Sequence, residues 1–148
     1  MIRLSSGLRR SVVTNYGLGS MLNGGRIDIY AGPQPISADI GVVAAPIAVI
    51  TQDGLLDSPD GGLLLAQGAV AGTLTHHGLW LMTGIAVGTA AWWRFVGDPE
   101  DMGSLDSSSD VRLDGAIGEG FEASGLPTII PEAVIEIQRF LLTLPANN

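Results

Sequence analysis

The sequence predicts an all-β protein: an antiparallel β-sandwich or jelly roll of about eight strands with a short N-terminal helix. Gly (21 residues) and Pro (8 residues) fall between short apolar segments, where they are typical of turns. Several of those segments alternate apolar and polar residues, which is the period of a strand with one solvated face. No alternation of strand and helix patterns occurs, which argues against a doubly wound α/β fold.

The length of 148 residues predicts a single β-sandwich domain, with residues 1–20 as an N-terminal helical arm and residues 21–148 as the body. One apolar face of a short helix is predicted by four residues spaced four apart: Leu4, Leu8, Val12 and Tyr16. Gly17 is expected to stop this helix, which would carry all three early arginines.

The clearest strand is Arg26–Tyr30, which follows an Asn-Gly-Gly turn and alternates charged and apolar residues. Further strands are predicted at residues 42–51, 63–66, 69–75, 79–83, 89–96, 111–117 and 133–144. Residues 52–62, 97–110 and 118–131 are predicted as loops, the second of them acidic and exposed. Trp92 and Trp93 are adjacent on a strand and therefore point to opposite faces, one into the core and one toward solvent or a neighbour.

Residues 61–93 form a stretch of thirty-three residues without a charged side chain. A membrane helix is a poor explanation, because seven glycines interrupt the stretch and glycine is a weak helix former. We expect several short strands, most of whose side chains are hidden on both faces. Partner subunits would have to cover part of them, which indicates an assembly protein.

The net charge of −8, with no lysine, disfavours nucleic-acid binding, because phosphate contacts need clustered basic residues. Arg3, Arg9 and Arg10 lie at the start of the chain, where they either dock onto an acidic neighbour or are solvated. Cysteine is absent, which excludes disulfides and thiolate metal sites. No signal-peptide pattern follows Met1, so we expect a protein made and used in the cytoplasm, or packaged there into a particle.

No motif predicts catalysis, a cofactor or a metal. His76 and His77 would point to opposite faces of a strand and lack a third ligand at zinc-like spacing. The acidic loop that begins at Asp98 fails as a calcium loop, because Met102 and Ser109 occupy its fifth and twelfth positions. The Gly-x-Gly-x-x-Ala pattern at residues 118–123 precedes no helix, and the absence of lysine excludes Schiff-base chemistry.

Three motifs carry a family resemblance. They are Asn-Gly-Gly-Arg-Ile-Asp-Ile-Tyr-Ala-Gly-Pro at residues 23–33, Gly-Thr-Ala-Ala-Trp-Trp-Arg-Phe at residues 88–95, and Arg-Leu-Asp-Gly-Ala-Ile-Gly at residues 112–118. Their order resembles that of small tailed-bacteriophage virion proteins, over residues 16–144. The architecture that the resemblance implies is that of the jelly-roll capsid cement (decoration) proteins of Bordetella-type phages. The chain departs from the pattern between residues 52 and 78, which leaves capsid surface, neck and tail open as positions.

The resemblance implies a non-enzymatic structural protein on the virion capsid surface, made in the host cytoplasm. Its partners would be the major capsid protein and copies of itself, as a dimer or trimer, with no nucleic acid and no membrane. The alternative is a tail or neck structural protein, or a glycan-binding adhesin module of a virion. The candidate interface residues are Arg3, Arg9, Arg10, Trp80, Trp92 and Trp93. For each tryptophan, packing in the core is the favoured alternative. A glycan site would instead need Tyr30, Trp80 or Trp92 exposed beside the 98–110 loop.

Overall fold

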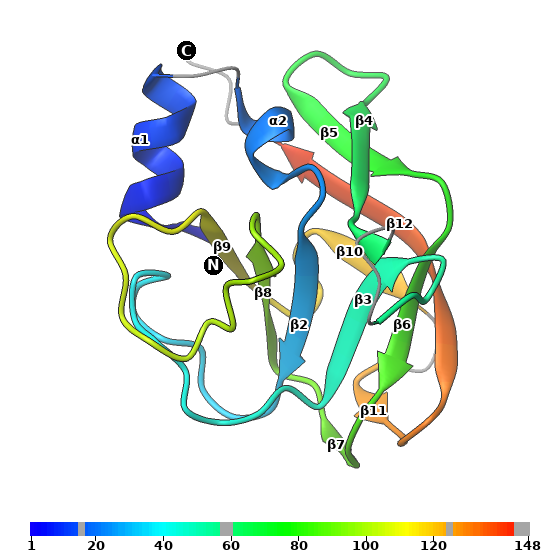
Figure 1. Cartoon of the computed structure of the whole chain (residues 1–148). Helices are drawn as coiled ribbons and strands as arrows, with labels where there is room; N and C mark the ends of the chain where they lie inside the picture. The colour runs from blue at the N-terminus through cyan, green and yellow to red at the C-terminus, as the bar shows by residue number, and fades with distance from the viewer. Residues whose placement is uncertain (15–16, 57–60, 124–125, 144–148) are drawn as a thin grey trace.

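The computed structural model describes residues 1–14, 17–56, 61–123 and 126–143. Within these residues the chain forms two short helices and twelve strands (Figure 1). In chain order they are β1 (Arg3–Leu4), α1 (Ser6–Thr14), α2 (Leu18–Leu22), β2 (Arg26–Tyr30), β3 (Ala48–Gln52), β4 (Leu64–Gln67), β5 (Thr73–His77), β6 (Trp80–Gly84), β7 (Gly88–Thr89), β8 (Trp92–Val96), β9 (Arg112–Ala116), β10 (Phe121–Ala123), β11 (Thr128–Ile129) and β12 (Val134–Thr143).

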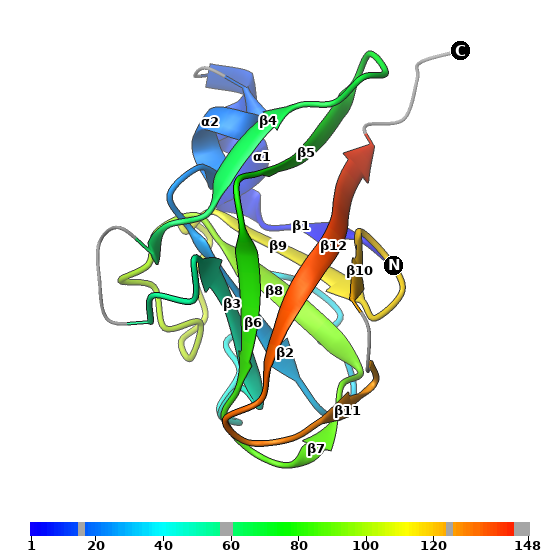
Figure 2. The ribbon, with the colours of Figure 1, turned by 90° about the vertical axis from the view of Figure 1, so that its right-hand side faces the viewer.

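Ten strands form one curled antiparallel sheet in the order β1-β9-β8-β2-β3-β6-β12-β5-β4, with β10 added on β12. β7 and β11 form a small second sheet at one end (Figures 1 and 2). The predicted all-β antiparallel fold is confirmed, and the layers that face each other across the core belong to one continuous sheet. Among the described residues, eight strands have four or more residues, in agreement with the predicted count.

Four aromatic rings from three strands fill the inside of the curl. Trp80 and Phe140 lie 5.0 Å apart between ring centroids, and Phe95 meets Phe140 edge to face at 6.1 Å. Trp93 also packs edge to face on Phe140, at 6.3 Å. All four side chains are fully buried, each contributing about 1.5–3 kcal/mol of hydrophobic stabilisation. This cluster therefore ties β6, β8 and β12 together across the core.

The strand β2 shows how the sequence pattern sets the two faces. Ile27 and Ile29 belong to the core, whereas the alternate residues point outward. Asp28 on the outer face is opposite Arg94 of β8 in the sheet register. Of the outer residues, Asp28 and Tyr30 are buried and Arg26 is partly buried, because the loops at residues 31–47 and 97–111 lie over this face (Figure 1). The strand was predicted as half-buried, and the covering loops account for the difference.

The start of the chain is attached to the sheet through β1, which pairs with β9. The predicted helix is confirmed over Ser6–Thr14, and the Ser5 hydroxyl caps it by accepting the Leu8 N–H at 3.0 Å. Leu4 lies in β1 and not on the helix, and Tyr16 lies outside the described residues. The helix α2 was not predicted; it follows Gly17 and buries Leu18 and Leu22.

The uncharged stretch forms β4 to β7 and the start of β8, so the prediction of short strands is confirmed. That partner subunits cover part of these strands stays a prediction, and in the single chain it concerns β4 and β5. Their residues are mostly half-exposed or exposed, since this hairpin and the end of β12 extend beyond the rest of the sheet (Figure 2). None of the described helices has the length and apolar character needed to cross a membrane.

Candidate functional site

Three arginines line the outer face of neighbouring strands. Arg26 lies on β2, Arg94 on β8 and Arg112 on β9. Arg94 is fully buried and donates two hydrogen bonds of 2.8 Å to the two carboxylate oxygens of Asp114. The pair is bidentate, the geometry in which a guanidinium and a carboxylate interact most strongly. Arg26 pairs in the same way with Asp28, at 2.7 and 3.1 Å.

The remaining donors of these arginines hold the two covering loops. Arg94 donates to the carbonyl oxygens of Ile40 (2.9 Å) and Gly103 (3.2 Å), one in each loop. Arg26 donates to the carbonyl oxygens of Pro99 and Asp101, at 2.8 and 3.0 Å. We call this group of three arginines and their acidic partners the arginine clamp, because it fastens both loops to the sheet.

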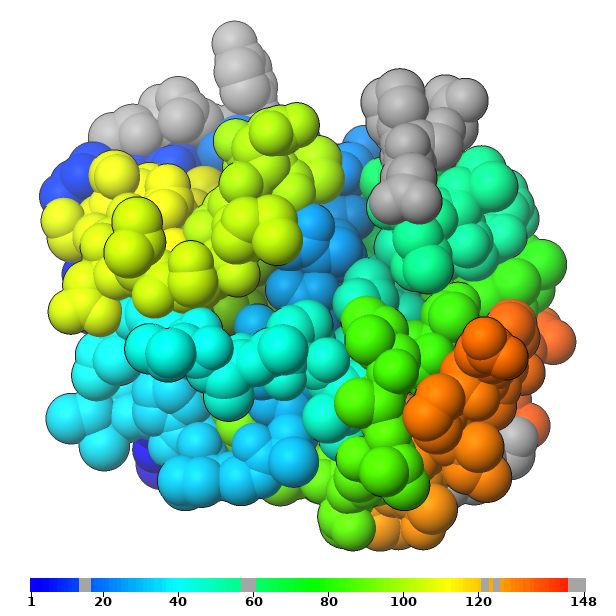
Figure 3. Space-filling model, turned by 60° about the horizontal axis from the view of Figure 1, so that its bottom comes forward, coloured from blue at the N-terminus to red at the C-terminus, as the bar shows by residue number. Residues whose placement is uncertain are grey.

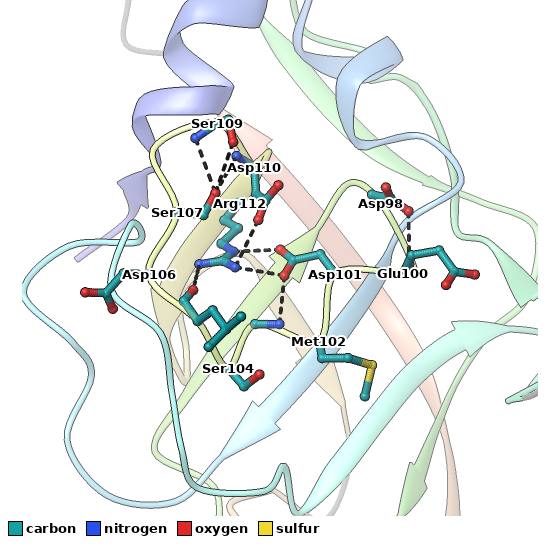
Figure 4. Close-up of a pocket in the computed structure, with 12 residues that line it drawn as sticks. Asp98, Glu100, Asp101, Met102, Ser104, Asp106, Ser107, Ser109, Asp110 and Arg112 are labelled. Atoms are coloured by element: carbon teal, nitrogen blue, oxygen red, sulfur yellow. Dashed lines mark hydrogen bonds and ion pairs between the residues drawn. The ribbon is translucent and has the colours of Figure 1, made fainter.

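A hollow lined by residues of the 98–110 loop lies beside Arg112 (Figure 4). Arg112 donates to both carboxylate oxygens of Asp101, at 2.6 and 2.8 Å, and to the Leu105 carbonyl oxygen at 3.0 Å. It also contacts the Asp110 carboxylate at 3.2 Å. The Arg112 guanidinium is therefore hydrogen-bonded within the chain and is not presented to a ligand.

The pKa values of the carboxyl groups in the clamp are shifted in two directions. Burial raises the pKa of the Asp28 and Asp114 carboxyls, and their arginine partners oppose that effect. Burial also acts to raise the pKa of Asp101, but hydrogen bonds from Arg112 and the Gly103 N–H outweigh it and hold the pKa below its usual range. Burial raises the pKa of Tyr30 to about 12, which keeps its phenol neutral.

This geometry is that of a structural clamp. Within the described ranges, no group of three or more His, Cys, Asp or Glu side chains could hold a metal ion. The loop predicted as acidic and exposed is mostly exposed, and arginines from three different strands also fasten it to the sheet. A sequence signal existed, since Arg-x-Asp occurs at residues 26–28 and again at residues 112–114, on what become β2 and β9.

The histidine pair lies on β5, with the rings on opposite faces as expected. His76 packs against Trp80 with 5.7 Å between centroids, and its Nδ1 atom accepts the Phe140 N–H at 3.3 Å. His77 is exposed at the end of the strand. The two rings therefore act separately, His76 as a packing residue and His77 at the surface.

Of the two roles predicted for the tryptophans, packing inside the protein is confirmed and the interface role is wrong in this fold, because Trp80, Trp92 and Trp93 are exposed by 0%, 2% and 0%. Trp92 and Trp93 do point to opposite faces, as predicted. The outward ring of Trp92 is covered by Tyr30, stacked at 4.5 Å, and by the guanidinium of Arg94 at 5.6 Å. Since Tyr30 is also buried, the aromatic platform expected of a glycan site is not at the surface.

The three early arginines are divided between two elements, so the prediction that the helix carries all of them is wrong for Arg3. Arg3 lies on β1, and its Nη1 atom donates to the Pro35 carbonyl oxygen. Arg9 and Arg10 are exposed on α1, where Arg9 donates to the Ser6 hydroxyl at 3.1 Å. Arg9 and Arg10 are therefore the candidate interface residues that the structure places at the surface.

One end of the sheet gathers exposed apolar side chains that sequence reasoning did not bring together. We call it the apolar end, and its members, with exposed fractions, are Val43 (96%), Val87 (77%), Ile130 (61%), Val134 (59%) and Ile85 (50%). They come from residues 41–47, 84–89 and 128–134, which form one continuous surface in cyan, green and orange (Figure 3). Large exposed apolar patches, unlike scattered single residues, mark interaction sites.

Backbone hydrogen bonds hold the three segments of the apolar end together. The N–H of Ile85 donates to the Ile47 carbonyl oxygen at 2.8 Å, and the N–H of Glu132 donates to the Gly84 carbonyl oxygen at 2.9 Å. β7 and β11 pair within the same region. Glu132 is the one charged residue in the three segments, in a chain whose net charge is −8. The three segments are therefore fixed and carry a single charge, and the acidic loop borders them where the Gly41 N–H donates to the Asp106 carboxylate at 2.7 Å.

Comparison of the chain with protein-family models, with curated proteins and with solved structures finds no match.

Proposed function

We propose that this chain is a non-enzymatic structural protein of a bacteriophage virion, a capsid decoration (cement) protein that clamps neighbouring major capsid proteins. The observation that carries the proposal is the apolar end. Five large apolar side chains are exposed to water there, on a backbone fixed by hydrogen bonds. Contact with another protein would remove them from water, which is favourable in free energy. A protein that acts by assembly has a use for such a surface.

The arginine clamp, which borders residues 41–47 of the apolar end, supports the same proposal. Arg94 and Arg112 are almost completely buried, and their partners are carboxylates and carbonyl oxygens of the chain itself. A cement protein needs loops that keep their shape under load, and buried bidentate pairs fix loops in one position. The sequence resemblance to small phage virion proteins supplies the setting, and repeated weak contacts on a symmetric shell would add up to firm attachment.

The test is the position of the chain on a particle. Virions that encode this chain would be labelled with a specific antibody and gold, and the copy number would be measured by quantitative gel analysis against the major capsid protein. The proposal predicts label over the shell and a copy number in a fixed ratio to the capsid protein. Particles that lack the chain would contradict it.

The same images separate the alternatives. Label confined to the tail or neck would assign the chain to a structural role there. A glycan-binding module would give specific hits on a glycan array, but Tyr30, Trp80 and Trp92 are buried and cannot stack on a sugar in this conformation. The capsid position is therefore the proposal that we retain.

A further inference from the structure

The turn between α2 and β2 combines a reactive dipeptide with backbone contacts that hold it closed. Asn23 and Gly24 form the one Asn-Gly pair in the sequence. A glycine nitrogen that follows asparagine can attack the side-chain amide, because the glycine has no side chain to shield it. We propose that Asn23 is a deamidation site that reacts only when residues 62–65 detach from residues 23–25.

The reaction needs only water as a co-reactant. The Gly24 amide nitrogen loses its proton and forms a bond to the Asn23 side-chain carbon Cγ, and ammonia leaves. Water then opens the resulting succinimide ring at either of its two carbonyl carbons, which gives aspartate or isoaspartate. No atom is oxidised or reduced. Asn23 is exposed, so water reaches its side chain.

In the folded chain the attacking nitrogen is occupied. The Gly24 N–H donates to the Leu63 carbonyl oxygen at 2.7 Å, and Asn23 has an extended ψ of 132°. Ring closure must break this hydrogen bond and rotate ψ, because the nitrogen has to turn toward the side chain. The side-chain oxygen of Asn23 is held as well, since it accepts the Leu65 N–H at 2.9 Å. Both reacting groups are therefore fixed by the segment that leads into β4.

The fold requires a glycine after Asn23. Gly24 has a φ of +86°, in the region that side-chain-bearing residues rarely adopt. The facing segment is packed closely on it, because a Cβ atom at Gly62 would lie 2.6 Å from the Gly24 carbonyl oxygen. The conformation that makes this joint tight thus also places the reactive pair in it.

The joint lies beside a part of the sheet that is suited to local opening. The β4–β5 hairpin extends beyond the rest of the sheet, and the residues of β4 are half-exposed or exposed (Figure 2). Such elements open more often than the whole protein unfolds. Opening breaks three hydrogen bonds: those from the Gly24 and Leu65 N–H groups, and one from the Leu63 N–H to the Gly25 carbonyl oxygen at 2.8 Å. Each shifts the opening equilibrium about fivefold, so the joint should slow deamidation about 100-fold relative to the unfolded chain.

The experiment is mass spectrometry of the full chain after incubation in buffer and in concentrated urea, at the same pH and temperature, with the modified residue located by peptide fragmentation. Leu63→Ala loosens the joint, because the Leu63 side chain is fully buried. Ile129→Ala is the matched control, since it truncates a buried side chain on β11, at the opposite end of the molecule (Figure 1). Asn23→Gln removes the reactive pair. Circular dichroism checks that each variant is folded.

The proposal predicts deamidation at Asn23 under both conditions, about 100-fold slower in buffer than in urea. Leu63→Ala should react at least about 10-fold faster in buffer than Ile129→Ala. Equal rates in buffer and urea, equal rates for these two variants, or a mass gain that Asn23→Gln leaves unchanged would overturn it.

Hydrogen exchange of the wild type keeps the proposal testable if Leu63→Ala does not fold. The Gly24 and Leu65 amides should exchange together by local opening, at a rate that low concentrations of urea leave unchanged. Exchange of these two amides only through global unfolding would overturn the proposal.

Discussion

The buried Arg94–Asp114 pair offers the sharpest test of the arginine clamp. We predict that Arg94→Met destabilises the protein strongly and that adding Asp114→Leu recovers part of the loss. In the single variant the Asp114 carboxylate, which is fully buried, loses its partner. Breaking a buried pair by removing one member typically costs about 3–5 kcal/mol.

The loop contacts add to this cost. Without Arg94 the carbonyl oxygens of Ile40 and Gly103 lose a donor, which adds about 1 kcal/mol for each. The single variant should therefore lose about 5–7 kcal/mol. The double variant leaves no unpaired carboxylate, so it should lose about 2 kcal/mol, mainly through the two carbonyls.

The assay is urea unfolding followed by tryptophan fluorescence, with Arg9→Met as the exposed control that should change stability by less than about 0.5 kcal/mol. The expected signature is a double variant that is more stable than Arg94→Met alone. If Arg94→Met cost less than about 1 kcal/mol, or the double variant lost the sum of both singles, the clamp would not be a coupled buried pair.

Three further predictions address the pH response, the close packing and the ring contacts. Asp101 has a lowered pKa in the folded state, so it contributes stability above its ordinary value of 3.8 that disappears as the pH falls. Asp101→Asn should flatten the acid loss in urea unfolding between about pH 5 and pH 2, and an unchanged slope would refute this. Gly25→Ala places a Cβ atom against a backbone oxygen of β8 and should lower the free energy of unfolding by at least about 1–3 kcal/mol. In Gly88→Ala the nearest atom to the new Cβ is a side-chain atom at 3.2 Å, so this variant should be less destabilised. Equal urea midpoints for the two variants would contradict the close packing at Gly25. Trp93→Phe removes a donor from two carbonyl oxygens, at 2.8 and 3.1 Å, but the Trp80 indole N–H has no partner among the described residues. Trp93→Phe should therefore lower the melting temperature more than Trp80→Phe, by the equivalent of about 1–3 kcal/mol, and the reverse order would be evidence against these contacts.

The strand pattern was predictable where side chains alternate on a half-covered face. Arg26–Tyr30 was predicted with the bounds that the structure gives, since its period of two is clear and a glycine turn precedes it. The next strand was predicted at residues 42–51 but begins at Ala48. The earlier residues belong to the covering loop, where the Val42 N–H donates to the Gly103 carbonyl oxygen at 2.8 Å. Apolar composition alone cannot separate such a loop from a strand.

The helix α2 was missed for a physical reason. Gly17 and Gly19 carry low helix propensity, so local sequence argues against a helix there. Burial of Leu18 and Leu22 against the body supplies the stabilisation, and that contribution depends on distant residues. The tryptophans show the same effect, because the outward face of Trp92 was covered by partners that the sequence does not reveal.

The apolar end was predictable only in part. The uncharged stretch of residues 61–93 indicated surfaces that a neighbour would cover, and Ile85 and Val87 belong to that stretch. Val43, Ile130 and Val134 belong to residues 41–47 and 128–134, which are far from that stretch in the sequence, and the fold brings these segments to the same surface (Figure 3). The arginine clamp likewise depends on the register that sets Asp28, Arg94 and Asp114 side by side across three strands.

A cryo-EM map of the particle, at a resolution that shows side chains, tests the central claim most directly. The account predicts copies of this chain on the outer shell, with Val43, Val87 and Ile130 of each copy against another protein of the particle. Density for the chain that leaves these three side chains facing bulk solvent, or shells without any density for it, would contradict the account.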